Sequence, residues 1–306
     1  MAIDQSGNGV AAGEQPPGDL DAPGEQIVLR SLSPSRAADF KSCPLLYRFR
    51  TIDRLPEQPS AAATRGTVVH SVLEQLFDLS PIERTPERAI ELLTPSWAQL
   101  LIQQPVLAEL FAGDTDGSAL NAWLESARAL LKTYFTLEDP RRFTPAGREQ
   151  LVQITLDSGL RLRGYIDRVD QTIDGQVRIV DYKTGASPRE AFEAKALFQM
   201  KFYALLWWRT TGTIPAVLKL IYLADADELR YSPQEAELQS LERQLSALWS
   251  AVELSIERKQ FTPHPSRLCD WCDFKAYCPE FGGQLPPFPA KTIQNAASPE
   301  QDGPSA

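Results

Sequence analysis

The four cysteines of this 306-residue chain limit how it can fold, because they are divided between its two ends. Cys269, Cys272 and Cys278 lie close together near the C-terminus, whereas Cys43 lies near the N-terminus. The N-terminus lacks the pattern of a secretion signal, so we do not expect disulfides. Four thiolates can instead hold a tetrahedral zinc ion or an iron–sulfur cluster. If all four share one such site, the two ends of the fold must meet.

The first half of the chain is predicted to be helical. Ser33-Pro34 has the pattern of a helix N-cap followed by proline at the first helical position. From Thr64 to Leu79 apolar residues recur with helical spacing. We therefore expect helices over 34–49, interrupted near Cys43-Pro44, and over 64–79, 86–102 and 118–138.

The pattern changes to strands near Glu149. Turn residues at 157–159 and 172–175 separate three segments with strand character, which we expect over 151–156, 160–170 and 177–183. A helix over 189–210, a strand over 216–223 and a long helix over 233–259 should follow. Helices followed by a three-stranded meander and then helix, strand and helix predict an α+β, or mixed α/β, fold.

The two ends of the chain differ in composition from its body. Residues 1–27 contain five acidic side chains and no Lys or Arg, and residues 284–306 are also polar and rich in proline. We expect disordered tails over 1–27 and 284–306 around one domain over 28–283. The formal net charge is −9, but without residues 1–27 and 280–306 the chain keeps 32 of its 40 acidic and 30 of its 31 basic residues. Charge therefore neither supports nor excludes a DNA partner.

The most apolar stretches, such as Tyr203 to Trp208, are far too short to span a bilayer. We therefore expect no membrane association. A cytoplasmic location is the default expectation.

Two aspartates and a lysine are predicted to converge on the hairpin between the second and third strands. If its turn is centred near Asp174, Asp167 lies opposite or nearly opposite Asp181, with their Cβ atoms about 5 Å apart. Two carboxylates at that distance repel each other unless a cation lies between them. Asp181 and Lys183 share one face of their strand. This set suits phosphodiester hydrolysis, in which Mg²⁺ or Mn²⁺ activates water and a lysine stabilises the transition state.

A plainer interpretation has to be weighed against this one. An isolated Asp-x-Lys is usually part of a solvated strand face, and Arg163 on the same face would suit a surface ladder of ion pairs. His70, one helical turn before Glu74, and Gln199, one turn before Tyr203, are also unremarkable singly. Their order around the two aspartates is what favours a catalytic site.

Taken in order, these motifs resemble those of the RecB-like PD-(D/E)XK nucleases. They are Gly66-x-x-x-His70-x-x-Leu73-Glu74, Gly164-x-Ile166-Asp167-Arg168-Val169-Asp170, Asp181-Tyr182-Lys183-Thr184-Gly185 and Gln199-x-x-x-Tyr203. The resemblance runs from about Leu32 to Pro279. It implies a restriction-endonuclease-like core sheet with flanking helices, a helical N-terminal half and a C-terminal iron–sulfur region.

The resemblance also implies roles for individual residues. The metal ligands would be His70, Asp167 and Asp181, with help from the Tyr182 carbonyl. Lys183 would be the catalytic lysine. Gln199 and Tyr203 would line the DNA path or support the site. Glu149 is a candidate match for an acidic position upstream of the first aspartate, and Glu74 is expected to support the site rather than bind metal.

The one-plus-three division of the cysteines resembles that of the iron–sulfur members of this family. In those members a distant N-terminal cysteine completes a 4Fe–4S site, and the segment Phe40–Tyr47 around Cys43 is similar to their first cysteine motif. Structural zinc sites usually consist of two close pairs, so zinc is the less favoured alternative. We expect Trp271, Phe274, Lys275 and Tyr277 to shield the cluster from water rather than touch DNA.

The leading hypothesis is a Mg²⁺- or Mn²⁺-dependent DNA nuclease. The resemblance implies a RecB-like exonuclease of DNA repair or recombination that acts on single strands or ends, with a helicase or repair protein as a partner. Two alternatives stay open: a non-catalytic DNA-binding or partner subunit, and a nuclease of CRISPR spacer acquisition. The chain has no P-loop motif, so we expect no helicase motor within it.

Overall fold

The computed structural model describes residues 31–187 and 190–289. The tail predicted over 1–27 lies outside the described residues, as does most of the tail predicted over 284–306. Among the described residues, no helix is both long and apolar enough to cross a membrane.

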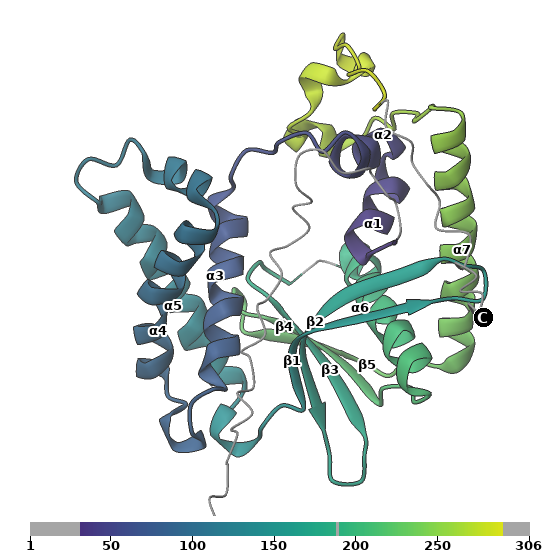
Figure 1. The fold of residues 1–306 in the computed structure, drawn as a ribbon. Coiled ribbons are helices and arrows are strands. Elements are labelled where there is room, and N and C mark those ends of the chain that lie inside the picture. The colour runs from purple at the N-terminus through teal and green to yellow at the C-terminus, as the bar shows by residue number, and fades with distance from the viewer. Residues whose placement is uncertain (1–30, 188–189, 290–306) are drawn as a thin grey trace, which may run out of the picture.

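A five-stranded sheet forms the centre of the molecule (Figure 1). Its strands follow one another in chain order: β1 (Gly147–Thr155), β2 (Arg161–Gln171), β3 (Val177–Lys183), β4 (Val217–Tyr222) and β5 (Asp227–Tyr231). The pairings β1–β2, β2–β3 and β4–β5 are antiparallel, whereas β3–β4 is parallel. The parallel pair requires a crossover, which α6 (Glu190–Thr211) supplies. The mixed α+β architecture expected from the sequence is confirmed.

The predicted register of the β2–β3 hairpin is also confirmed. Arg168 pairs with Val180 and Val169 pairs with Ile179, the register that brings Asp167 toward Asp181. Gly175 closes the turn with a positive φ of 84°, and its N–H donates to the Thr172 carbonyl. Glycine takes this conformation without the clash that a Cβ atom would cause.

Helices cover both faces of the sheet (Figure 1). On one face, α6 and α7 (Glu235–Glu257) bury a core with residues of all five strands. On the other face, α3 (Ala61–Leu76), α4 (Pro86–Gln103) and α5 (Ser118–Leu137) form a helical lobe, whose core includes Val180 and Tyr182 of β3. Short 3₁₀ turns at Pro81–Glu83 and Pro105–Phe111 lie between the three helices, and a third at Pro140–Arg142 lies between α5 and β1.

The two ends of the described chain meet in a third unit, which we call the cysteine lobe (Figure 1, top). It contains α1 (Pro34–Ser42), α2 (Pro44–Tyr47), a π-helical turn (Arg48–Ile52) and three 3₁₀ turns (Arg267–Trp271, Lys275–Tyr277 and Pro279–Phe281). The core of this lobe includes Phe49, Phe261 and Phe274 and the C-terminal part of α7. The sequence prediction that the ends come together is thus confirmed.

Local signals explain where several helices begin. The Ser33 hydroxyl accepts the Arg36 N–H ahead of α1, and Thr85 caps α4 in the same way. Cys43 has an extended backbone between α1 and α2, which is the interruption expected at Cys43-Pro44.

Two sequence expectations need correction. The edge strand β5 was not predicted, because its five residues are mostly polar and none is buried. The C-terminal boundary at 283 was too early: the Arg48 guanidinium donates to the Pro286 carbonyl at 2.6 Å, and the Phe288 ring lies 6.3 Å from that of Phe261. Contacts with the domain therefore continue as far as Phe288.

Candidate active site

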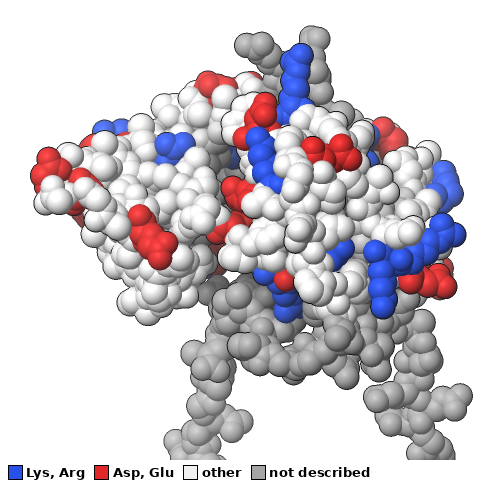
Figure 2. Space-filling view, turned by 90° about the horizontal axis from the view of Figure 1, so that it is seen from above, with Lys and Arg blue, Asp and Glu red and all other residues white. Residues whose placement is uncertain are grey.

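The residues singled out in the sequence come from five elements that meet beside the helical lobe. His70 comes from α3, Glu149 from β1, Asp167 from β2, Asp181 to Lys183 from β3, and Gln199 and Tyr203 from α6. Viewed from above, a hollow separates the helical lobe from the rest of the molecule, and acidic side chains border it (Figure 2).

His70, Glu149 and Asp167 form the tightest group of potential metal ligands. One ligand atom from each lies within 4.8 Å of the other two. His70 Nδ1 lies 3.4 Å from Asp167 Oδ2 and 4.0 Å from Glu149 Oε1. His70 Nε2 lies 3.0 Å from the Tyr182 carbonyl oxygen. This contact favours a proton on Nε2, which leaves the Nδ1 lone pair facing the two carboxylates.

Glu149 enters this group because of the shape of β1. In the register Arg148–Arg168 and Gln150–Ile166, Glu149 faces Asp167 across the ladder. Glu149 also has a positive φ of 40°, which is uncommon for a residue with a Cβ atom. Beyond this point the β1–β2 hairpin turns away from β3 (Figure 1). The sequence made Glu149 only a candidate, since no local signal marks a positive φ at a glutamate.

Asp181 lies beside this group but has different partners. Its side chain is 2% exposed, so it does not belong to a solvated strand face. Lys183 Nζ lies 2.6 Å from Asp181 Oδ2, and the Gln199 amide donates to Oδ1 at 3.1 Å. Gln199 Oε1 in turn accepts from Lys183 Nζ at 2.9 Å, and the Gln199 amide lies 2.9 Å from the Tyr203 hydroxyl. The structure thus brings Asp181, Lys183, Gln199 and Tyr203 into one hydrogen-bonded set.

The carboxylates in this region repel one another. Burial and the nearby Asp181 carboxylate together raise the pKa of Asp167 to about 6, although His70 lowers it. Burial, together with repulsion from Asp167, Glu74 and Asp181, raises the pKa of Glu149 to about 8. A cation placed among these oxygen atoms would relieve both penalties. The donor set of carboxylates and one imidazole therefore fits a divalent metal ion such as Mg²⁺ or Mn²⁺.

Tyr182 contributes its backbone in a way the sequence did not reveal. Its N–H donates to Asp167 Oδ2 at 2.7 Å, and its carbonyl oxygen faces His70 Nε2. In this arrangement the carbonyl expected to bind metal is engaged by His70.

Two motif glycines allow the elements to approach. A Cβ atom on Gly164 would lie 2.9 Å from the Tyr203 ring, so this position of β2 needs glycine for α6 to pack. A Cβ atom on Gly66 would lie 3.1 Å from the Thr184 hydroxyl, where α3 approaches the loop after Lys183. The first contact places α6 with Tyr203 against β2, and the second places α3 next to the end of β3.

A layer of buried ion pairs lies under the site, and the sequence analysis did not predict it. Arg168 is 1% exposed and pairs with Glu138, which in turn pairs with Lys219. The signal that could have indicated it is the position of Lys219 within the apolar strand β4, because buried charged residues are nearly always paired.

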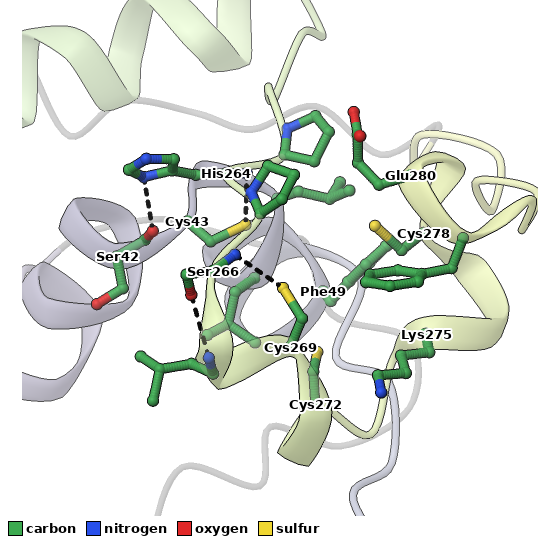
Figure 3. A pocket seen from close by; sticks show the side chains of 16 residues that line it. Ser42, Cys43, Phe49, His264, Ser266, Cys269, Cys272, Lys275, Cys278 and Glu280 are labelled. Atoms are coloured by element: carbon green, nitrogen blue, oxygen red, sulfur yellow. Dashed lines mark hydrogen bonds between the residues drawn. The ribbon is translucent and has the colours of Figure 1, made fainter.

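In the cysteine lobe, Cys43, Cys269, Cys272 and Cys278 line one pocket, with their sulfur atoms around a common space (Figure 3). Backbone N–H groups of His264 and Ser266 point at the sulfur atoms of Cys43 and Cys269, both at 3.4 Å. Among the described residues, no three sulfur atoms lie within 4.8 Å of one another.

The aromatic residues around this pocket differ in burial. Phe274 is buried and packs on Phe49 at 5.4 Å, as expected of a shielding residue. Trp271 is 78% exposed, so the expectation that it shields the pocket was wrong. Tyr277 is partly exposed against Phe49, and Lys275 lies 3.6 Å from Asp270.

Comparison with known proteins gives a consistent result. The model of the PD-(D/E)XK nuclease superfamily matches residues 31–279. Gene 69 protein of Mycobacterium phage D29 is 26% identical over 281 residues, which cover 84% of this chain and 99% of that protein. Gene 69 protein of Mycobacterium phage L5 is 25% identical over 297 residues, which cover 83% and 97%.

Two further matches are a partial sequence match and a solved structure. An ATP-dependent helicase/deoxyribonuclease subunit of Streptococcus agalactiae is 27% identical over 159 residues, which cover 51% of this chain but only 14% of that protein. The solved structure of a candidate exonuclease from Eubacterium rectale shares the fold with a TM-score of 0.53 and 13% identity, covering 79% of this chain and 87% of that one.

Proposed function

Because the chain belongs to the PD-(D/E)XK nuclease superfamily, we propose that it is a metal-dependent DNA nuclease whose reaction depends on Asp167, Asp181 and Lys183. One observation carries this proposal. The ion pair of Lys183 and Asp181, at 2.6 Å, lies next to the His70, Glu149 and Asp167 group. The acid and lysine set is complete, which favours an active nuclease over a non-catalytic binding subunit.

The metal ion would be Mg²⁺ or Mn²⁺, held by His70, Glu149, Asp167 and Asp181. When bound, such an ion polarises the phosphate and lowers the pKa of a coordinated water. The burial and mutual repulsion of the carboxylates support this assignment. Glu149 joins the proposed ligands on geometry, and Tyr182 holds two of them through its backbone.

Lys183 would stabilise the negative charge that grows on the phosphate during hydrolysis. Its ammonium group forms an ion pair with Asp181 and donates a hydrogen bond to Gln199 Oε1. Of its three N–H donors, those not used by Gln199 can face a phosphate oxygen. Gln199 positions the lysine and the aspartate together, and the Tyr203 hydroxyl orients the Gln199 amide.

The proposed substrate is DNA, as single strands or ends, and the proposed role is a RecB-like exonuclease of repair or recombination. The partial match to a protein called a helicase/deoxyribonuclease subunit supports this role and supports a helicase as partner. Recognition would depend mainly on the DNA backbone, with binding that weakens as salt increases.

The direct test is a nuclease assay on labelled single- and double-stranded DNA. Anaerobically purified protein is incubated with Mn²⁺, Mg²⁺ or EDTA, beside Asp181→Ala. We expect metal-dependent cutting by the wild type alone, and the product lengths separate exonuclease from endonuclease action. Folded wild-type protein that cuts no substrate would favour the alternative of a binding subunit.

We further propose that the four cysteines hold a 4Fe–4S cluster. The one-plus-three spacing of the cysteines supports this assignment, as do their common pocket and the two N–H groups directed at sulfur. Iron and acid-labile sulfide analysis of anaerobically purified protein tests it. Stoichiometric zinc without iron would contradict it.

A further inference from the structure

Arg168 lies in the layer directly beneath the candidate active site. Its side chain is 1% exposed, and its guanidinium donates to both oxygens of Glu138, at 2.7 and 3.0 Å. The same guanidinium donates to the Tyr182 hydroxyl at 2.5 Å and to Asp170 at 3.2 Å. The ring of Phe143 covers it at 4.8 Å. Glu138, Tyr182, Asp170 and Phe143 thus hold the group in one orientation.

Tyr182 connects this buried guanidinium to the site. Its side chain is held at the hydroxyl by Arg168, while its backbone contacts two of the three clustered side chains. The N–H binds Asp167 at 2.7 Å and the carbonyl faces His70 at 3.0 Å. Because the ring, hydroxyl and backbone belong to one buried residue, a shift of the ring would move both contacts.

Glu138 fixes the guanidinium to the rest of the fold. It is the C-cap residue of α5, and it also accepts from Lys219 of β4 at 2.9 Å. The helical lobe and the sheet therefore hold Arg168 jointly. A buried ion pair is a weak source of stability compared with apolar packing, and one attested use is to select a single arrangement.

We propose that Arg168 is a positioning residue for the metal centre, acting through the hydroxyl of Tyr182. This inference rests on the proposed metal-dependent function. In this role Arg168 would act without touching the substrate or the metal ion. It fixes the Tyr182 backbone and, through it, the orientation of Asp167 and His70. Residues that orient metal ligands in this way typically change metal affinity or activity by about 10- to 100-fold when they are altered.

The test uses Tyr182→Phe in the full-length protein, because this change removes the hydroxyl and keeps the ring. We expect Mn²⁺ binding, measured by calorimetry or by electron paramagnetic resonance, to weaken by about tenfold or more. Cutting at low Mn²⁺ should fall in parallel, whereas saturating Mn²⁺ should restore most of the wild-type rate. A loss of stability alone would not shift the Mn²⁺ dependence in this way.

Tyr47→Phe is the matched control. Tyr47 is fully buried in the cysteine lobe, and its hydroxyl has no hydrogen-bond partner among the described residues. The Mn²⁺ affinity of Tyr47→Phe should equal that of the wild type.

Arg168→Lys is the second variant, because lysine cannot reproduce the paired contacts with Glu138 while also holding Tyr182. It should weaken Mn²⁺ binding at least as much as Tyr182→Phe.

Mn²⁺ affinity of Tyr182→Phe within twofold of the wild type would overturn the inference and leave the proposed function standing. An equal loss in Tyr47→Phe would also overturn it, because the effect would then be general. A wild type that neither binds Mn²⁺ nor cuts DNA would overturn the proposed function, and this inference with it.

Discussion

Lys183 Nζ lies 2.6 Å from Asp181 Oδ2, and both side chains are held by the amide of Gln199. Asp181 is almost fully buried, whereas 29% of the Lys183 side chain is exposed. The lysine therefore extends from a buried anchor toward the surface from which a phosphate would approach. An ordinary surface ion pair exposes both partners, whereas here only the lysine is exposed.

Lys183→Ala should lower the rate of DNA cutting by about 10²- to 10³-fold, because it removes a positive charge next to the developing charge on phosphate. Asp181→Asn should lower it at least as much. Both variants should still bind DNA, measured by fluorescence anisotropy without a metal ion. Lys201→Ala is the control, since Lys201 lies on α6 and pairs with Glu237 away from this set. Near wild-type cutting by Lys183→Ala would refute its assigned role.

Mn²⁺ affinity should rise between pH 6 and pH 8. Glu149 has a pKa raised to about 8 and Asp167 one raised to about 6, so a bound cation must displace protons that these groups hold at lower pH. Calorimetry in two buffers with different heats of ionisation should detect proton release. Glu149→Gln should weaken binding and reduce this pH dependence. Equal affinity at pH 6 and pH 8 would remove Glu149 from the ligand set.

The raised pKa of Glu149 also predicts how stability responds to pH. Because its folded-state pKa lies above the ordinary value of 4.5, the folded state loses stability through this group as the pH rises from there toward 8. Added Mn²⁺ should therefore raise Tm more at pH 8 than at pH 6. Thermal unfolding of wild type and Glu149→Gln at both pH values measures the difference.

The hairpin could be predicted from the sequence because local features fix it. The turn at Thr172–Gly175 sets the register, and the register places Asp167 near Asp181. The place of Glu149 could not be predicted, since it depends on a positive φ at a residue that rarely adopts one.

The buried ion pairs could not be predicted from the sequence for another reason. Glu138 and Lys219 lie far from Arg168 in the chain, and only the packing of α5 against β4 brings them together. The order of the motifs identified the side chains of the candidate active site. It gave no information about the buried ion pairs beneath them.

Acid should weaken the folded state through Glu138. Burial alone would raise its pKa, but hydrogen bonds from Arg168 and Lys219 outweigh burial and hold the pKa at about 2. Glu138 therefore contributes stability that is complete above the ordinary value of 4.5 and is lost as the pH falls toward 2. Glu138→Gln should destabilise the protein by about 3 kcal/mol at pH 7, because it leaves buried positive charge with fewer partners.

The comparison requires urea unfolding of both proteins at pH 7 and at pH 3. The difference in unfolding free energy between wild type and Glu138→Gln should be clearly smaller at pH 3. A difference that stays constant with pH would show that the ionised carboxylate is not the stabilising form.

Cys43→Ser should remove the cluster from the cysteine lobe. Cys43 is the one cysteine from the N-terminal part of the chain, and with it the proposed cluster closes a loop of more than 200 residues to Cys269. Closing a loop of that size with a disulfide restricts the unfolded chain by about 4–5 kcal/mol, and a cluster should act in the same sense. We therefore expect Cys43→Ser to lose iron and sulfide and to unfold at a markedly lower temperature. Ser42→Ala, at the exposed neighbouring position, should retain both metal content and Tm. If Cys43→Ser kept its full iron content, the cluster would need a different fourth ligand. The two parts of the cysteine lobe would then be joined by its apolar core, which includes Phe49, Phe261 and Phe274, without help from Cys43.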